Sequence, residues 1–137
     1  MNPHFELSDD HFEEEFKNCK LDPALFNHEA HLRLAWIHVT KYGEAKAIEN
    51  ITGQLYAYVV SLGAIDKYNK TLTIAAIKAV NHFIGRSGAD NFAEFIQQFP
   101  RLKFNFKELM GFHYGINIFN SEIAKQHYLE PDLLPFT

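Results

Sequence analysis

The feature that most constrains the fold is a series of segments with apolar residues at helical spacing, each bounded by residues that start or stop helices. The clearest segment runs from His28 to Tyr42, where Asn27 can cap the first turn and Gly43 can end the last. Apolar residues recur there every three or four positions, whereas a strand would show alternation. The same pattern predicts further helices from Asp9 onward, over 44–62 and 70–84, between Asn91 and Pro100, near 108–114, and from about Ser121 to Gln126.

These segments predict an all-α fold, a compact bundle of five or six helices. The chain has 137 residues, of which 47% are hydrophobic, and this length suits a single domain over 1–137 with a sizeable core. On the helix that starts at His28, the face opposite the core carries Glu29, Arg33 and Thr40. The predicted core of the second, third and fourth helices consists of Leu32, Ala35, Val39, Leu55, Val59, Ala76, Val80 and Phe83.

Two stretches near the end of the chain lack the helical pattern. Leu102, Phe104 and Phe106 alternate with polar residues, a period of two that is typical of a strand. No other stretch offers a partner strand, so we expect this stretch to be extended. The last residues, 130–137, contain two prolines, and we expect a non-helical tail that is packed on the surface by Leu133, Leu134 and Phe136.

Acidic residues are concentrated at the start of the chain. The first 16 residues hold six acids and no Lys or Arg, which is typical of a solvated helix face and also compatible with an interaction patch. They lack the basic start and apolar run of a secretory signal, and no apolar stretch approaches the ~18–20 residues that cross a bilayer. A single cysteine, Cys19, leaves no internal disulfide. We therefore expect a soluble cytoplasmic protein with no membrane partner.

One basic run has the residue types of a nucleic-acid surface. Arg101, Lys103 and Lys107 are interleaved with Phe104 and Phe106, as in proteins that bind single strands. Three bases in a chain of formal charge −4 argue against that function, because general nucleic-acid binders are usually basic. We expect no nucleic-acid partner.

Histidines in the clearest helix are the first candidates for chemistry. His28 and His31 stand three residues apart, so their rings are neighbours on one face and could share a divalent metal or act on a substrate directly, as base and partner. The same spacing is compatible with histidines that only bond to nearby loops. His38 lies ~10.5 Å further along the axis than His31, which excludes it from the same ion and favours a packed or hydrogen-bonded role.

A second polar cluster opens the fourth helix. Tyr68, Asn69 and Thr71 could form a rim that holds a small polar or anionic ligand, and Thr71 is equally a candidate helix cap with a structural role only. An up-down-up order of the second, third and fourth helices would bring the N-termini of the second and fourth to the same end. We therefore expect Tyr68 or Thr71 to lie near His28 or His31.

Three motifs together resemble a family of small uncharacterised bacterial proteins. They are Phe26-x-His28-x-x-His31-Leu32-Arg33-Leu34-Ala35-Trp36, then Lys67-Tyr68-x-x-Thr71-x-Thr73, then Glu130-Pro131-Asp132-Leu133. The resemblance implies that His28, His31, Tyr68 and Thr71 matter, and it attaches no function to them. The second motif of this family usually reads Lys-Tyr-His, whereas Asn69 stands here. If that histidine is a third metal ligand in relatives, its replacement weakens metal binding in this chain.

The sequence thus favours a small-molecule enzyme or ligand-binding pocket. In this hypothesis His31 is base or metal ligand, His28 is its partner, and Tyr68, Asn69 and Thr71 contact the substrate. The alternative is a non-catalytic helical interaction module whose histidines are structural. Whether the chain is an enzyme, which substrate or metal it takes, and whether it forms a homo-oligomer are left open by the sequence.

Overall fold

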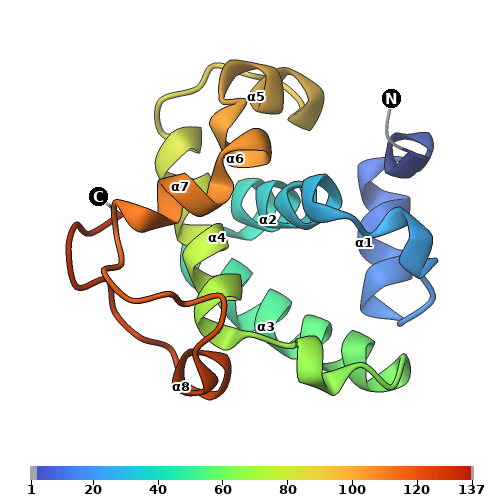
Figure 1. Cartoon of the computed structure of the whole chain (residues 1–137). Coiled ribbons are helices and arrows are strands. Elements are labelled where there is room, and N and C mark those ends of the chain that lie inside the picture. Colours follow the sequence, from blue (N-terminus) through green and yellow to red (C-terminus); the bar gives the residue numbers. More distant parts are fainter. Residues whose placement is uncertain (1–2, 137) are drawn as a thin grey trace. The chain divides into compact units, whose positions relative to one another are not determined.

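The computed structural model describes residues 3–136, and no strand occurs in that range (Figure 1). The all-α prediction is confirmed, with eight α-helices among these residues against the five or six expected. They are α1 (Asp9–Lys17), α2 (His28–Tyr42), α3 (Glu44–Ser61), α4 (Lys70–Ile84), α5 (Phe92–Gln98), α6 (Arg101–Phe104), α7 (Phe106–Gly111) and α8 (Glu122–Gln126). Three 3₁₀ turns join them, η1 (Pro3–Glu6), η2 (Pro23–Leu25) and η3 (Ile65–Lys67).

The chain divides into two compact units, Met1–Tyr68 and Asn69–Thr137. The first unit contains α1, α2 and α3, and the second contains α4 to α8. The expectation of a single domain stays a prediction.

Capping residues place the helix starts where the sequence predicts them. The side chain of Asn27 accepts a hydrogen bond from the backbone N–H of Ala30 at 2.9 Å, and Gly43 ends α2 with a φ of 85°, a conformation that favours glycine. Side chains cap four other helices in the same way, at Ser8, Asn69, Asn91 and Ser121, and Asp22 caps η2.

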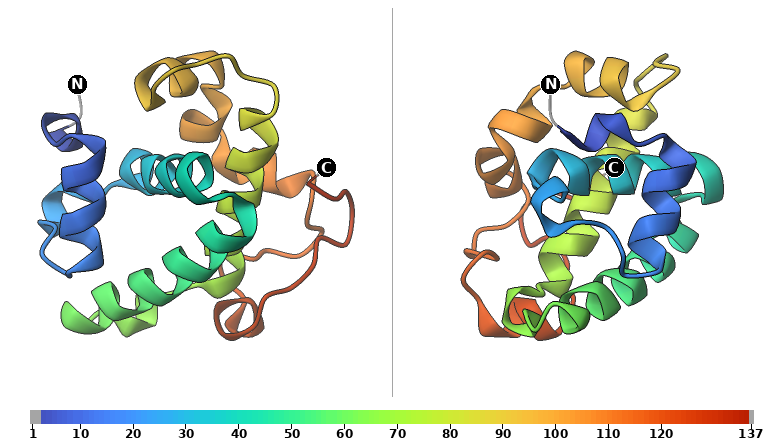
Figure 2. Two further views of the ribbon diagram at one scale, coloured as in Figure 1. Left: turned by 180° about the vertical axis from the view of Figure 1, so that it is seen from behind. Right: turned by 90° about the vertical axis from the view of Figure 1, so that its right-hand side faces the viewer.

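In the first unit, α2 and α3 diverge from Gly43, and α1 packs against both (Figure 2). An aromatic cluster joins these elements, because the ring of Phe16 lies 4.9 Å from the rings of both Phe26 and Tyr58. The hydroxyl of Tyr58 also donates a hydrogen bond to the backbone oxygen of Leu21 at 2.8 Å. The loop that leads into α2 is therefore anchored to α1 and α3.

The polar face of α2 is not solvated as its sequence pattern implied. Glu29 and Arg33 are each 4% exposed, so α2 is buried on almost every side. Both side chains bond to the N-terminal segment that precedes α1. The sequence pattern of α2 could not indicate this burial, because the segment that covers the polar face lies more than twenty residues away along the chain.

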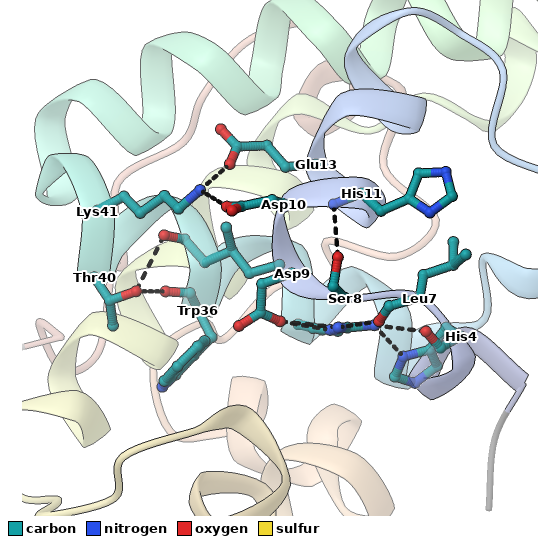
Figure 3. Close-up of polar contacts among 12 residues, drawn as sticks. His4, Leu7, Ser8, Asp9, Asp10, His11, Glu13, Trp36, Thr40 and Lys41 are labelled. Atoms are coloured by element: carbon teal, nitrogen blue, oxygen red, sulfur yellow. Dashed lines mark hydrogen bonds and ion pairs between the residues drawn. The ribbon is translucent and has the colours of Figure 1, made fainter.

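The acids of α1 form neither a purely solvated face nor an open interaction patch. Asp9 accepts two hydrogen bonds from Arg33, and Asp10 and Glu13 both accept from Lys41 (Figure 3). Three of the five acids of α1 thus pair with basic residues of α2. This pairing is intramolecular, so these three acids fasten α1 to α2.

The stretch 101–107 is helical, and the prediction of an extended segment is wrong. The backbone oxygen of Pro100 accepts hydrogen bonds from the N–H groups of Lys103 and Phe104, which starts α6. Helical turns satisfy their own backbone groups, and among residues 3–136 no strand offers an alternative partner. The following helix, α7, accordingly begins at Phe106 instead of near residue 108.

Most of the predicted core is buried. Six of the eight residues are 9% exposed or less, whereas Ala76 and Phe83 are half-buried. The stripe on α4 is rotated relative to the prediction and is formed by Thr71, Ile74, Ala75, Ile77, Ala79 and Val80. Phe83 instead packs at the edge of the second unit, 4.9 Å from the ring of Phe99.

The C-terminal tail is non-helical over residues 130–136, but Leu133 and Leu134 do not bury their side chains. Backbone bonds hold the tail: the N–H of Leu133 donates to the oxygen of His113, and the ring of His113 contacts the oxygen of Leu134 at 2.8 Å. Phe136 stacks on the same ring at 4.0 Å. Of the three predicted anchors, Phe136 alone therefore packs against the unit.

Within residues 3–136, no helix combines the length and the apolar character that crossing a membrane requires.

Candidate functional site

His28 and His31 lie on the first turn of α2, in the first unit. Both residues are exposed, although the residues around them on α2 are mostly buried. Their imidazoles are close enough for the charge of one to affect the proton affinity of the other. The structure therefore brings the predicted pair together on an accessible surface.

Phe26 fixes the plane of the His31 ring. The two rings stack at 3.8 Å between centroids with an interplanar angle of 26°. Phe26 is itself packed at 4.9 Å against Phe16 and at 5.4 Å, edge-on, against Tyr58. Because this aromatic cluster belongs to three elements of the first unit, His31 has a defined orientation rather than a mobile one.

The surroundings of His31 hold its imidazole in the neutral form. The protein atoms around the ring disfavour its charged form, and the nearby imidazole of His28 adds to this effect, so the pKa of His31 is lowered from 6.5 to about 4. The residue is nevertheless exposed, so these atoms do not close the ring off from solvent. His31 thus offers an unprotonated nitrogen at neutral pH.

The metal hypothesis has two histidine ligands and, among residues 3–136, no group that adds a third protein ligand. No group of three or more His, Cys, Asp or Glu side chains that could hold an ion is found in the described part of the chain. Structural and catalytic metals usually take at least three protein ligands. A metal bound at His28 and His31 would have to complete its coordination with solvent or with a ligand molecule.

His38 is fully buried, in agreement with the packed role predicted for it. Its Nδ1 lies 3.4 Å from the side-chain nitrogen of Asn50 on α3, and its Nε2 has no hydrogen-bond partner among residues 3–136. Burial lowers the pKa of His38, the carboxylate of Glu13 opposes that effect, and the ammonium of Lys41 adds to it. The residue packs α2 against α3.

Tyr68 ends the first unit. Its hydroxyl donates a hydrogen bond to the backbone oxygen of Thr52 at 3.4 Å, and its ring meets Tyr56 edge-on at 5.5 Å. Burial and the neighbouring phenol of Tyr56 raise the pKa of Tyr68, so its hydroxyl stays protonated at neutral pH. Its approach to the histidine pair stays a prediction.

Asn69 and Thr71 are tied to the backbone of the second unit. The amide of Asn69 accepts from the N–H of Leu72 at 3.0 Å and donates to the oxygen of Ile118 at 2.8 Å. The hydroxyl of Thr71 donates to the oxygen of His127 at 2.7 Å and accepts from the N–H of Leu129 at 3.0 Å. Asn69, and not Thr71, is therefore the cap of α4, and the only hydroxyl proton of Thr71 is already used.

A buried polar network in the first unit was missed by the sequence reasoning. All five N–H groups of Arg33 have partners: Asp9 accepts two, the backbone oxygens of His4 and Leu7 accept one each, and the fifth faces the His4 ring at 3.4 Å (Figure 3). His4 is fully buried and its Nε2 lies 2.8 Å from Glu29. The four-residue spacing of Glu29 and Arg33 was the available signal, and it equally fits a surface ion pair.

Comparison of the chain with protein-family models, with curated proteins and with solved structures finds no match. The resemblance of the three motifs to a bacterial family therefore stays a prediction.

Proposed function

We propose that the chain binds a small polar molecule at the histidine pair, with neutral His31 accepting a hydrogen bond from it. The observation that carries this proposal is an exposed imidazole that stacks on Phe26, and its lowered pKa supports the proposal. Ordinary surface histidines are neither fixed nor strongly shifted in this way. The ligand class is a molecule that presents an O–H or N–H group, and His28 lies beside it as a second imidazole.

The lowered pKa of His31 favours ligand binding over base catalysis. A group whose conjugate acid has a pKa of about 4 is a weak base at neutral pH, whereas efficient general bases have pKa values near the working pH. As an enzyme, the chain would need its ligand to raise the proton affinity of His31. Turnover of a bound compound distinguishes an enzyme from a binding protein.

One observation favours the alternative of an interaction module. Near the C-terminal end of α3, four large apolar side chains are 45–51% exposed, namely Tyr56, Val60, Leu62 and Ile65. Exposed apolar groups of this kind occur at protein interfaces. Sedimentation analysis of wild type and Val60→Glu tests whether these side chains form an interface between copies of the chain. A change of oligomeric state in the variant would support the interaction module.

The ligand proposal is tested by a screen of small alcohols, amides and carboxylic acids, using saturation-transfer NMR at neutral pH. We expect at least one compound to bind wild type, and we expect His31→Leu to weaken it about fivefold, as the loss of a specific hydrogen bond predicts. The matched control is His11→Leu, since the His11 side chain is 56% exposed on α1. Hits that bind His31→Leu as well as wild type, or a screen without hits, would contradict the proposal.

The metal content of the purified protein tests whether a divalent ion takes part in ligand binding. A stoichiometric metal that is lost in His28→Ala/His31→Ala would show that the ion binds at the histidine pair. An unchanged content in the double variant would place any metal elsewhere.

A further inference from the structure

Exposed aromatic rings and cations gather on α6, on α7 and on the segment that follows, all in the second unit. Phe104 is 72% exposed, the highest value of any large hydrophobic side chain in the described residues, and Phe112 is 49% exposed. Packing in the core therefore does not explain why either position carries a phenylalanine. We call this region the basic-aromatic surface, formed by Arg101, Lys103, Phe104, Lys107, Phe112 and Phe119.

Each of its rings has a cation close to it. The Lys103 ammonium lies 5.0 Å from the centre of the Phe104 ring, and the Arg101 guanidinium lies 5.6 Å from that of Phe112. A third pair joins Lys107 and Phe119 at 5.9 Å. Within the nineteen residues from 101 to 119, a cation that could bind an anion thus lies beside an aromatic ring that could stack on a flat group in three places.

The local charge is less negative than that of the whole chain. Residues 94–122 contain three bases and three acids, Glu94, Glu108 and Glu122, which leaves 10 bases and 14 acids elsewhere. The net charge of −4 that led us to expect no nucleic-acid partner therefore arises outside this segment.

We propose that the basic-aromatic surface binds single-stranded nucleic acid, with phosphates on its cations and unpaired bases stacked on Phe104 and Phe112. Each nucleotide of a single strand supplies one anionic and one flat apolar group, which matches the paired cation and ring. This proposal is independent of the histidine pair, which lies in the first unit.

The structure favours a nucleic acid over an anionic membrane as the occupant. Amphipathic helices that lie on a membrane bury one continuous apolar face in it. Here α6 has four residues and α7 has six, so neither helix offers such a face. Glu108 lies 3.8 Å from Arg101 and competes with phosphate, so binding is expected to be weak.

The test measures fluorescence anisotropy of a labelled oligothymidylate, about twelve nucleotides long, titrated with the full chain up to about 200 µM. We expect binding at low salt, with a slope of log K against log salt of about −2 for three cations. Phe104→Ala should weaken binding about fivefold or more, because a stacked base is lost. Lys103→Gln/Lys107→Gln should reduce the slope to about −0.7, and Glu108→Gln should tighten binding about twofold.

Two controls separate this surface from general stickiness. Ile123→Ala removes another exposed apolar side chain of the second unit, and Lys46→Gln removes an exposed cation of the first unit, so both should bind like wild type. No binding at low salt, equal losses in the controls, or equal affinity for a blunt duplex would overturn the proposal. Binding to vesicles of phosphatidylserine without binding to the oligonucleotide would overturn it in favour of a membrane.

Discussion

Arg33→Ala should lower the free energy of unfolding by about 3–5 kcal/mol, the cost of removing one partner from a buried ionic network. The Arg33 side chain is 5% exposed, and its guanidinium holds Asp9 and the backbone of the segment before α1. Its loss would leave the backbone oxygens of His4 and Leu7 without these donors. The measurement is urea unfolding of the full chain followed by circular dichroism.

The matched control for that variant is Lys41→Ala. Lys41 also joins α1 to α2, but its side chain is 37% exposed, and its partners Asp10 and Glu13 are 87% and 15% exposed. Ion pairs of a solvated ammonium contribute about 0–1 kcal/mol each, so the control should cost about 2 kcal/mol at most, less than Arg33→Ala. Equal losses of unfolding free energy in the two variants would show that the network around Arg33 does not hold the N-terminal segment in place.

Leu55→Ala should cost about 2–5 kcal/mol, because the leucine is 6% exposed on α3 and its truncation leaves a cavity. Tyr56→Ala, at the next position and 51% exposed, provides the comparison and should cost much less. A loss below about 1 kcal/mol for Leu55→Ala would show that this face of α3 does not pack into the core.

Helix boundaries were predictable from sequence wherever a cap and an apolar stripe coincide. For α2, Asn27 and Gly43 bracket the helix at the predicted residues, because both the side-chain cap and the positive φ are local properties. The stretch after Pro100 failed for the opposite reason. Its alternation of Phe104 and Phe106 with polar residues imitates a strand, whereas a segment without a partner strand satisfies its backbone groups by forming helical turns.

The candidate site was predictable in part. The spacing of His28 and His31 placed both on one turn, whereas the stacking of Phe26 on His31 depends on a loop conformation that no residue pattern specifies. The roles of Asn69 and Thr71 depend on backbone groups about fifty residues away. Contacts of this kind come from tertiary packing, which the local sequence does not encode.

The protonation of His31 is measured directly by an NMR titration of its imidazole. The resonance is assigned by its loss in His31→Gln, and its chemical shift is followed from pH 8 downward. We expect no titration through the ordinary range near 6.5 and a pKa of about 4. A His31 that becomes protonated at or above pH 6.5 would contradict the proposed role of its imidazole.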